Sequence, residues 1–300
     1  TAALPPNLDW YRMSSSMYTV KQLRQQVVQE ALALGPTKSQ TLGQYLYSNT
    51  GYVILGAIVE TLTGEPWETV IQREIFDRLD MKSGGFGVPG GVKKSTTFSS
   101  WLGMSSKSQS VDRAHGHVPS KFAIFSSNPY SVCQIDNAPV VGPAGTIHCS
   151  IPDWAKFVSK IILLTGAASV GTANAPSSSV VDVLSSVLSA VTSSSKCSDS
   201  LSDSDHAASH LGVSVSTYRE CLQLNNPSQH YAGGFIVTSR PWAGGLALTH
   251  TGSNTTWYAT VWIAPLKRTA YLAAFNVGGD VVEAAANNTV VRMIECDHSL

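Results

Sequence analysis

The 300-residue chain has few charged side chains and no net charge. Charged residues make up 13% of it, against about 25% in typical soluble domains. Lys plus Arg and Asp plus Glu number 20 each, so the chain has no net field to attract nucleic acid or an anionic membrane. Ser and Thr carry much of the polarity instead. This composition favours a secreted or periplasmic protein and leaves the compartment unknown.

Long apolar runs are also absent. No segment approaches the about 18 to 20 uninterrupted apolar residues that a transmembrane helix needs, so the sequence predicts no membrane span. With 43% hydrophobic residues, the chain can nevertheless build one large core or two lobes that share a cleft.

The five cysteines show no C-x-x-C pair and no spacing typical of a zinc site. Disulfides between Cys133 and Cys149 and between Cys197 and Cys221 would leave Cys296 as the odd thiol. Five reduced and mostly buried thiols are the equally open alternative.

Two short motifs that resemble ligand sites are incomplete. His115-Gly116-His117 offers two imidazoles, but no Asp, Glu or Cys at ligand spacing completes a metal site, so a solvated or cleft-lining loop is expected. Gly85–Gly90 spells G-x-G-x-x-G, yet it follows a helix rather than a strand and contains a proline. The sequence therefore predicts neither a metal nor a cofactor.

Hydrophobic periodicity divides the chain into three parts and predicts an α+β fold. Residues 1–165 form a mainly helical lobe behind a Pro-rich arm, and residues 166–229 form a Ser-rich, partly helical insertion. Residues 230–300 form an antiparallel sheet and a C-terminal helix. Helices are expected at 20–34, 66–80, 151–165 and 281–295, and strands at 231–239, 246–251, 256–264 and 269–277.

The run Tyr47–Gly64 is the centre of the helical lobe. A polar loop, Tyr47-Ser48-Asn49, leads directly into an amphipathic helix that Gly64 ends. The helix has one recurring face, made of Val53, Gly56, Ala57, Glu60 and Thr61. A tyrosine acts as a general base or proton relay when a nearby cation lowers its pKa, and an asparagine beside it donates and accepts hydrogen bonds. A capped core helix with a surface tyrosine also explains these residues.

This run resembles the Tyr-x-Asn box and following helix of the serine β-lactamase and penicillin-binding-protein-like family. The resemblance is to its class C branch of D-alanyl-D-alanine carboxypeptidases and related esterases. Further stretches resemble the same branch in the same order: Ile75–Met81, Pro143-Ala144-Gly145 with Asp153–Phe157, and His250-Thr251-Gly252. The resemblance implies a β-lactamase/transpeptidase-like fold, with a cleft between the helical lobe and the sheet.

The resemblance also implies a set of site residues. Tyr47, Asn49 and His250 are the expected catalytic residues, with Tyr47 and His250 on opposite walls of one cleft. His250 stands where the family has Lys or His, and it is a weaker cation near pH 7. The expected substrate-binding and oxyanion residues are Thr251, Gly252, Ser253, Asn254 and Trp257.

One part of the family pattern is absent. The family's nucleophile lies in Ser-x-x-Lys on the N-terminal side of the Tyr-x-Asn box, and no such motif precedes Tyr47. The match at Ser193–Lys196 lies in the Ser-rich insertion and in the wrong order, so it is interpreted as coincidence. A missing N-terminal segment or chain is therefore expected to complete a serine hydrolase for a small peptide, amide or ester, and its strands should pair beside residues 269–277. The alternative is a catalytically inactive binding or structural subunit.

Overall fold

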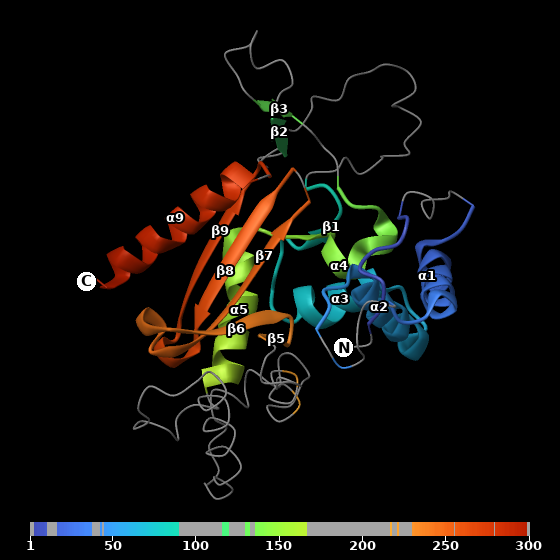
Figure 1. Ribbon diagram of the computed structural model, residues 1–300, viewed down its shortest axis with the longest axis horizontal. Coiled ribbons are helices and arrows are strands. Elements are labelled where there is room, and N and C mark those ends of the chain that lie inside the picture. The colour runs from blue at the N-terminus through green and yellow to red at the C-terminus, as the bar shows by residue number, and fades with distance from the viewer. Residues whose placement is uncertain are drawn as a thin grey trace, which may run out of the picture.

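The computed structural model describes a helical lobe packed beside a five-stranded sheet (Figure 1). The residues it describes are 3–10, 17–37, 43, 45–89, 116–119, 130–132, 136–166, 217, 221, 230–254, 256–278 and 280–298. The insertion predicted at 166–229 lies almost entirely outside this set. No helix in the described part of the chain is both long and apolar enough to cross a bilayer.

The helical lobe consists of short elements that follow the predicted pattern with one difference. A capping box at Thr19 begins the first helix, and Gly64, in the left-handed conformation, ends the second as predicted. The single helix predicted at 66–80 is instead a short α-helix followed by a π-helical segment. The elements are α1 (Val20–Leu34), α2 (Asn49–Thr63), α3 (Trp67–Ile71), η1 (Gln72–Asp77), η4 (Pro139–Val141) and α4 (Gly142–Gly145).

The buried face of α2 is the predicted one except at its last residue. Val53, Gly56, Ala57 and Glu60 are buried, whereas Thr61 is exposed and donates its hydroxyl hydrogen to the carbonyl of Ala57. Gly56 is required by packing, because a Cβ there would lie 2.3 Å from Pro143 Cγ on α4. Valines and leucines of α1 and η4 complete this core: Leu23, Val27, Val140 and Val141.

A buried ion pair crosses the same core. Arg24 of α1 is fully buried and its guanidinium lies 2.6 Å from Oε1 of Glu60, which is 1% exposed. The guanidinium also donates to both carboxylate oxygens of Glu68 and to the carbonyls of Pro139 and Val140. Because each buried charge has a partner, the group joins α1, α2, α3 and η4 without leaving an isolated ion.

The sheet is an antiparallel meander in the order β5-β6-β7-β8-β9. The single strand predicted at 231–239 is wrong, since Gly233 and Gly234 adopt positive φ and turn the chain into a hairpin. Ala232 then pairs with Phe235. The strands are β5 (Tyr231–Ala232), β6 (Phe235–Arg240), β7 (Gly245–Ser253), β8 (Tyr258–Ala264) and β9 (Thr269–Phe275).

Helices cover both faces of this sheet (Figure 1). Helix α5 (Ile151–Gly166) packs its Val158, Ile161 and Ile162 against the strands. Helix α9 (Asp280–His298) packs against β8 and β9 from the opposite side. Small two-stranded sheets join β1 (Gly85–Phe86) to β4 (Ile147–His148) and β2 (His117–Pro119) to β3 (Tyr130–Val132).

Neither of the two disulfides that the sequence left open is formed, since one cysteine of each pair is a free thiol. Cys149 and Cys221 are free thiols, while Cys133 and Cys197 lie outside the described residues. Cys149 behaves as a small apolar side chain that packs on the Phe76 cluster, and burial raises the pKa of its thiol to about 11. Cys296 is exposed on α9.

We expect Arg24→Ala to lower the free energy of unfolding by about 3–5 kcal/mol, because it leaves the carboxylate of Glu60 buried without its partner. Urea denaturation followed by circular dichroism measures this change. Arg73→Ala is the matched control, since Arg73 pairs with Glu65 and Glu74 on an exposed surface and such pairs add little. Equal losses in the two variants would contradict the role given to the buried pair.

Candidate active site

The Tyr-x-Asn box lies at the start of α2 and is held there by the N-terminal arm. Ser48 is the N-cap: its hydroxyl accepts from the amide of Gly51 and donates to the carbonyl of Pro5. The backbone amide of Asn49 donates to Pro6, and its side-chain amide donates to Asn7 Oδ1 at 2.8 Å. The arm therefore fixes the box, and the amide group of Asn49 contacts the arm.

Tyr47 precedes this cap and is 46% exposed. Its pKa is raised above the ordinary value, first by partial burial and then by the neighbouring Tyr52. The expected role as a base needs a cation that lowers this pKa. Among the described residues the surroundings of Tyr47 act in the opposite direction and favour the protonated phenol.

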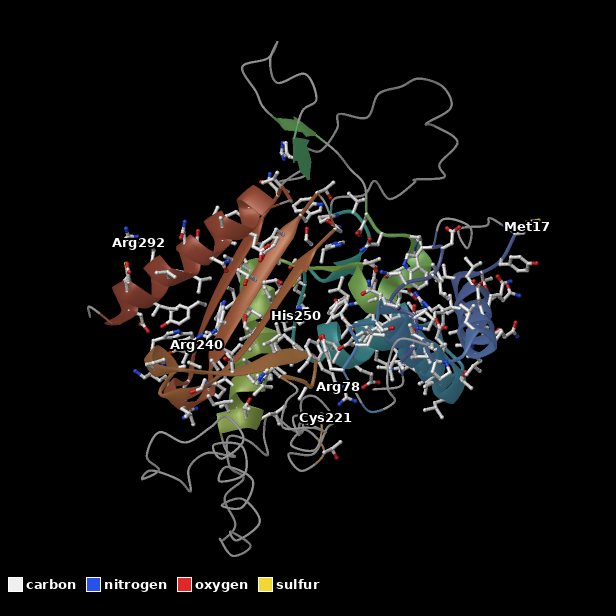
Figure 2. All side chains as sticks on the ribbon, viewed as in Figure 1. Met17, Arg78, Cys221, Arg240, His250 and Arg292 are labelled. Atoms are coloured by element: carbon white, nitrogen blue, oxygen red, sulfur yellow. The ribbon has the colours of Figure 1, made fainter. Side chains whose placement is uncertain are left out.

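His250 lies near the end of β7, where the strand leaves the core. Residues 246–249 of β7 are buried and residues 251–253 are exposed, so His250 stands at the transition. Figure 2 shows His250 between the sheet and the helical lobe. Burial lowers the pKa of His250, and a backbone hydrogen bond with Thr251 opposes this in part. The imidazole is therefore neutral at neutral pH.

Tyr231 of β5 brings the two expected catalytic residues together. The rings of Tyr47 and Tyr231 meet edge to face with centroids 6.5 Å apart, and those of Tyr231 and His250 with centroids 5.7 Å apart. The hydroxyl of Tyr231 lies 3.0 Å from Nε2 of His250 and 3.3 Å from the hydroxyl of Tyr52. Tyr47 and His250 thus come from different lobes and contact one shared residue.

The three residues after His250 form an exposed strand end. Thr251, Gly252 and Ser253 pair with Thr260, Ala259 and Tyr258 of β8. A Cβ built on Gly252 would meet no atom within 4 Å, so the packing of the protein itself does not require a glycine here. The position that a Cβ on Gly252 would take is open space.

Asn254 and Trp257 shape the turn between β7 and β8. The side-chain oxygen of Asn254 accepts from Thr256 and from the amide of Trp257, and its nitrogen donates to Asp136 Oδ1 at 2.7 Å. These bonds tie the turn to the segment before η4. The indole nitrogen of Trp257 is buried and has no hydrogen-bond partner within the described structure.

The two incomplete ligand motifs, Gly85–Gly90 and His115–His117, lie only partly within the described residues. Gly85 belongs to β1, while Gly90 falls outside the described residues, as does His115. His117 Nδ1 lies 3.1 Å from the carbonyl of Asn276. No cluster of three metal-ligating side chains occurs in the part of the chain that the structure describes.

Tyr45, Tyr52 and Tyr231 also lie at the candidate site and were not predicted from the sequence. Tyr52 stands in the box run itself, and Tyr231 begins a strand beside a Gly-Gly turn. These two positions are the signals in the sequence that could have identified Tyr52 and Tyr231. An aromatic residue next to a turn lies at a strand end, where its side chain can reach the edge of the core.

The fold is that of the β-lactamase/transpeptidase-like class. A family model described as Beta-lactamase matches residues 1–294, and the chain belongs to this family. The octameric penicillin-binding protein homologue from Pyrococcus abyssi aligns with a TM-score of 0.51 and 17% identity, over 87% of this chain and 44% of that chain. The predicted fold class is thus confirmed.

Two amidases are also similar. The D-amino acid amidase from Ochrobactrum anthropi SV3, in complex with L-phenylalanine amide, aligns with a TM-score of 0.53 and 15% identity, over 98% of this chain and 66% of that chain. The N-acetylmuramyl-L-alanine amidase of Bacillus subtilis (strain 168) is 32% identical over 81 residues, 27% of this chain and 18% of the amidase. The chain thus spans only part of the length of these relatives.

We expect His250 to make the protein less stable at acid pH. Its folded pKa lies below the unfolded value of about 6.5, so the unfolded chain binds more protons as the pH falls below that value. The contribution of neutral His250 to the free energy of unfolding is fully present above about pH 6.5 and is lost as the pH falls below that value. Urea unfolding of the wild type and of His250→Gln measures this, and the wild type should lose more stability on acidification. Parallel pH profiles would contradict it.

Proposed function

We propose that this chain supplies the Tyr-x-Asn and His-Thr-Gly parts of a serine hydrolase that transfers an acyl group from a small peptide, amide or ester. The observation that carries the proposal is the meeting of Tyr47 and His250 at Tyr231. A phenol and a neutral imidazole beside an open strand end suit proton transfer and hydrogen bonding to a substrate. The amide of Ser253 would be one oxyanion donor.

The amide part of this proposal is supported by the relatives. The printed names of two of them describe a D-amino acid amidase and an N-acetylmuramyl-L-alanine amidase. Both names denote the cleavage of an amide, which matches the amide substrate of this proposal. A carboxypeptidase or esterase activity remains part of the same proposal.

We propose further that the nucleophilic serine and its lysine come from residues outside these 300. The only Ser-x-x-Lys match is Ser193–Lys196, which follows the box in the chain. Strand β9 pairs with β8 and stands at the edge of the described sheet, where a further strand would add. Its Tyr271 and Ala273 are buried on the sheet, and apolar edges of this kind favour pairing.

A second candidate is a catalytically inactive binding or structural subunit. It is favoured by the engagement of Asn49 with Asn7 and of Asn254 with Asp136, because both amides are turned to contacts within the protein. A serine-reactive fluorophosphonate separates the two candidates. A full-length natural protein that is not labelled would contradict the hydrolase, and a label on Ser193 or another serine of this chain would contradict the proposed origin of the nucleophile.

We expect Tyr47→Phe to lower kcat/KM of the full-length protein for a chromogenic amide by about 10²–10⁴-fold, the usual contribution of a positioned acid or base. The phenylalanine keeps the edge-to-face contact with Tyr231 and removes only the hydroxyl. Tyr45→Phe is the matched control, since Tyr45 packs on the same ring with centroids 5.3 Å apart and has no proposed role in proton transfer. A similar small effect in both variants would rule out Tyr47 as the acid or base.

A further inference from the structure

Tyr231 contacts both Tyr47 and His250, and also two further tyrosines of the candidate site. Its ring packs against Tyr45, Tyr47 and His250, with centroids 5.3, 6.5 and 5.7 Å away. Its hydroxyl lies within hydrogen-bond distance of Tyr52 and of Nε2 of His250. The three ring contacts fix the position of the Tyr231 side chain. The two hydrogen-bond partners of its hydroxyl fix the orientation of that group.

Tyr231 and His250 lie on strands β5 and β7, with β6 between them. Tyr231 of β5 pairs with Ile236 of β6, and Ile236 pairs with Thr249 of β7. Two strand spacings of about 4.8 Å therefore separate the backbones of Tyr231 and Thr249. The side chains of Tyr231 and His250 together cross this distance, since the hydroxyl of Tyr231 lies 3.0 Å from Nε2 of His250.

The direction of the hydrogen bond follows from the chemistry of the partners. The pKa of Tyr231 is raised far above the ordinary range, first by burial and then by its hydrogen bond with Tyr52, so the phenol keeps its proton. A neutral imidazole has one nitrogen that donates and one that accepts. Its unprotonated nitrogen is a stronger acceptor than a phenol oxygen. Donation from Tyr231 to Nε2 of His250 pairs the better donor with the better acceptor, and the hydroxyls of Tyr231 and Tyr52 are within hydrogen-bond distance with either one as the donor.

We propose that Tyr231, backed by Tyr52, is a positioning residue that holds His250 in the tautomer with its hydrogen on Nδ1. The hydrogen bond at one ring nitrogen decides which nitrogen carries the hydrogen. Nε2 is then occupied and not available as a base, and His250 offers an N–H donor from the other side of its ring. This gives Tyr231 the orienting function of the third member of a catalytic group, and its importance for catalysis rests on the proposed function.

Nuclear magnetic resonance of the protein labelled with ¹⁵N-histidine tests this directly. Two-bond ¹⁵N–¹H correlation spectra distinguish the two neutral tautomers, and His250→Gln identifies the signals of His250 among those of the eight histidines. At about pH 8, where the ring is neutral, wild-type His250 should show the hydrogen on Nδ1. A wild-type protein with the hydrogen on Nε2 would overturn the proposal without any variant.

Variants at the tyrosines make the test specific. Tyr231→Phe keeps the ring contacts and removes the donor, so the population should shift toward the tautomer with the hydrogen on Nε2, which free imidazole side chains prefer in water. Tyr52→Phe should cause a smaller shift in the same direction, because only the outer hydroxyl is lost. Tyr45→Phe, which changes a ring neighbour outside the hydrogen-bonded chain, should leave the spectrum as in the wild type.

The outcome is read independently of catalysis. A Tyr231→Phe spectrum equal to the wild-type one, in a variant whose circular dichroism confirms folding, would overturn the proposal. The tautomer is measured without substrate, so failure of the fluorophosphonate to label the protein would reject the proposed hydrolase and leave the assignment of Tyr231 intact. Conversely, a labelled protein with the wrong tautomer would retain the hydrolase and reject the positioning role.

Discussion

The buried guanidinium of Arg24 is the constraint on which the helical lobe depends. It neutralises Glu60, donates to Glu68, and caps the carbonyls of Pro139 and Val140. Its central carbon also lies over the ring of Trp67, 5.6 Å from the centroid. A buried charge that loses its partner is strongly unfavourable, so α1, α2 and α3 have one mutual arrangement. The start of α2, and with it Tyr47, is positioned by that arrangement.

The contact between helical lobe and sheet at the candidate site is of a different kind. It consists of aromatic rings and neutral hydroxyls, with Tyr231 between Tyr52 and His250. Neutral hydrogen bonds of this type contribute modestly to stability but are directional. Each lobe is therefore stabilised mainly by its own core. The hydrogen bonds of Tyr52 and Tyr231 instead orient His250 and, by our proposal, set its tautomer.

Much of the fold could be predicted from periodicity and turn residues. The helix at 20–34 and the meander after residue 230 depend on local patterns of apolar residues, which the sequence displays. The split of the first strand was missed although Gly233-Gly234 is a hairpin signal, because the strand-like residues on both sides of it were interpreted as one strand. The ion pair was not predicted, although Glu60 stood on the predicted buried face, because it joins residues 36 positions apart.

The sequence by itself determined that Tyr47 and Asn49 begin a helix and that His250 stands near a strand end, because caps and strand ends are set by neighbouring residues. It also determined that no Ser-x-x-Lys precedes Tyr47. Only the tertiary structure decided that Asn49 contacts the arm and that Tyr231 joins Tyr52 to His250. Tyr52 and Tyr231 are 179 positions apart, and a hydrogen bond over that separation depends on how the lobes and strand register pack, which no local pattern encodes.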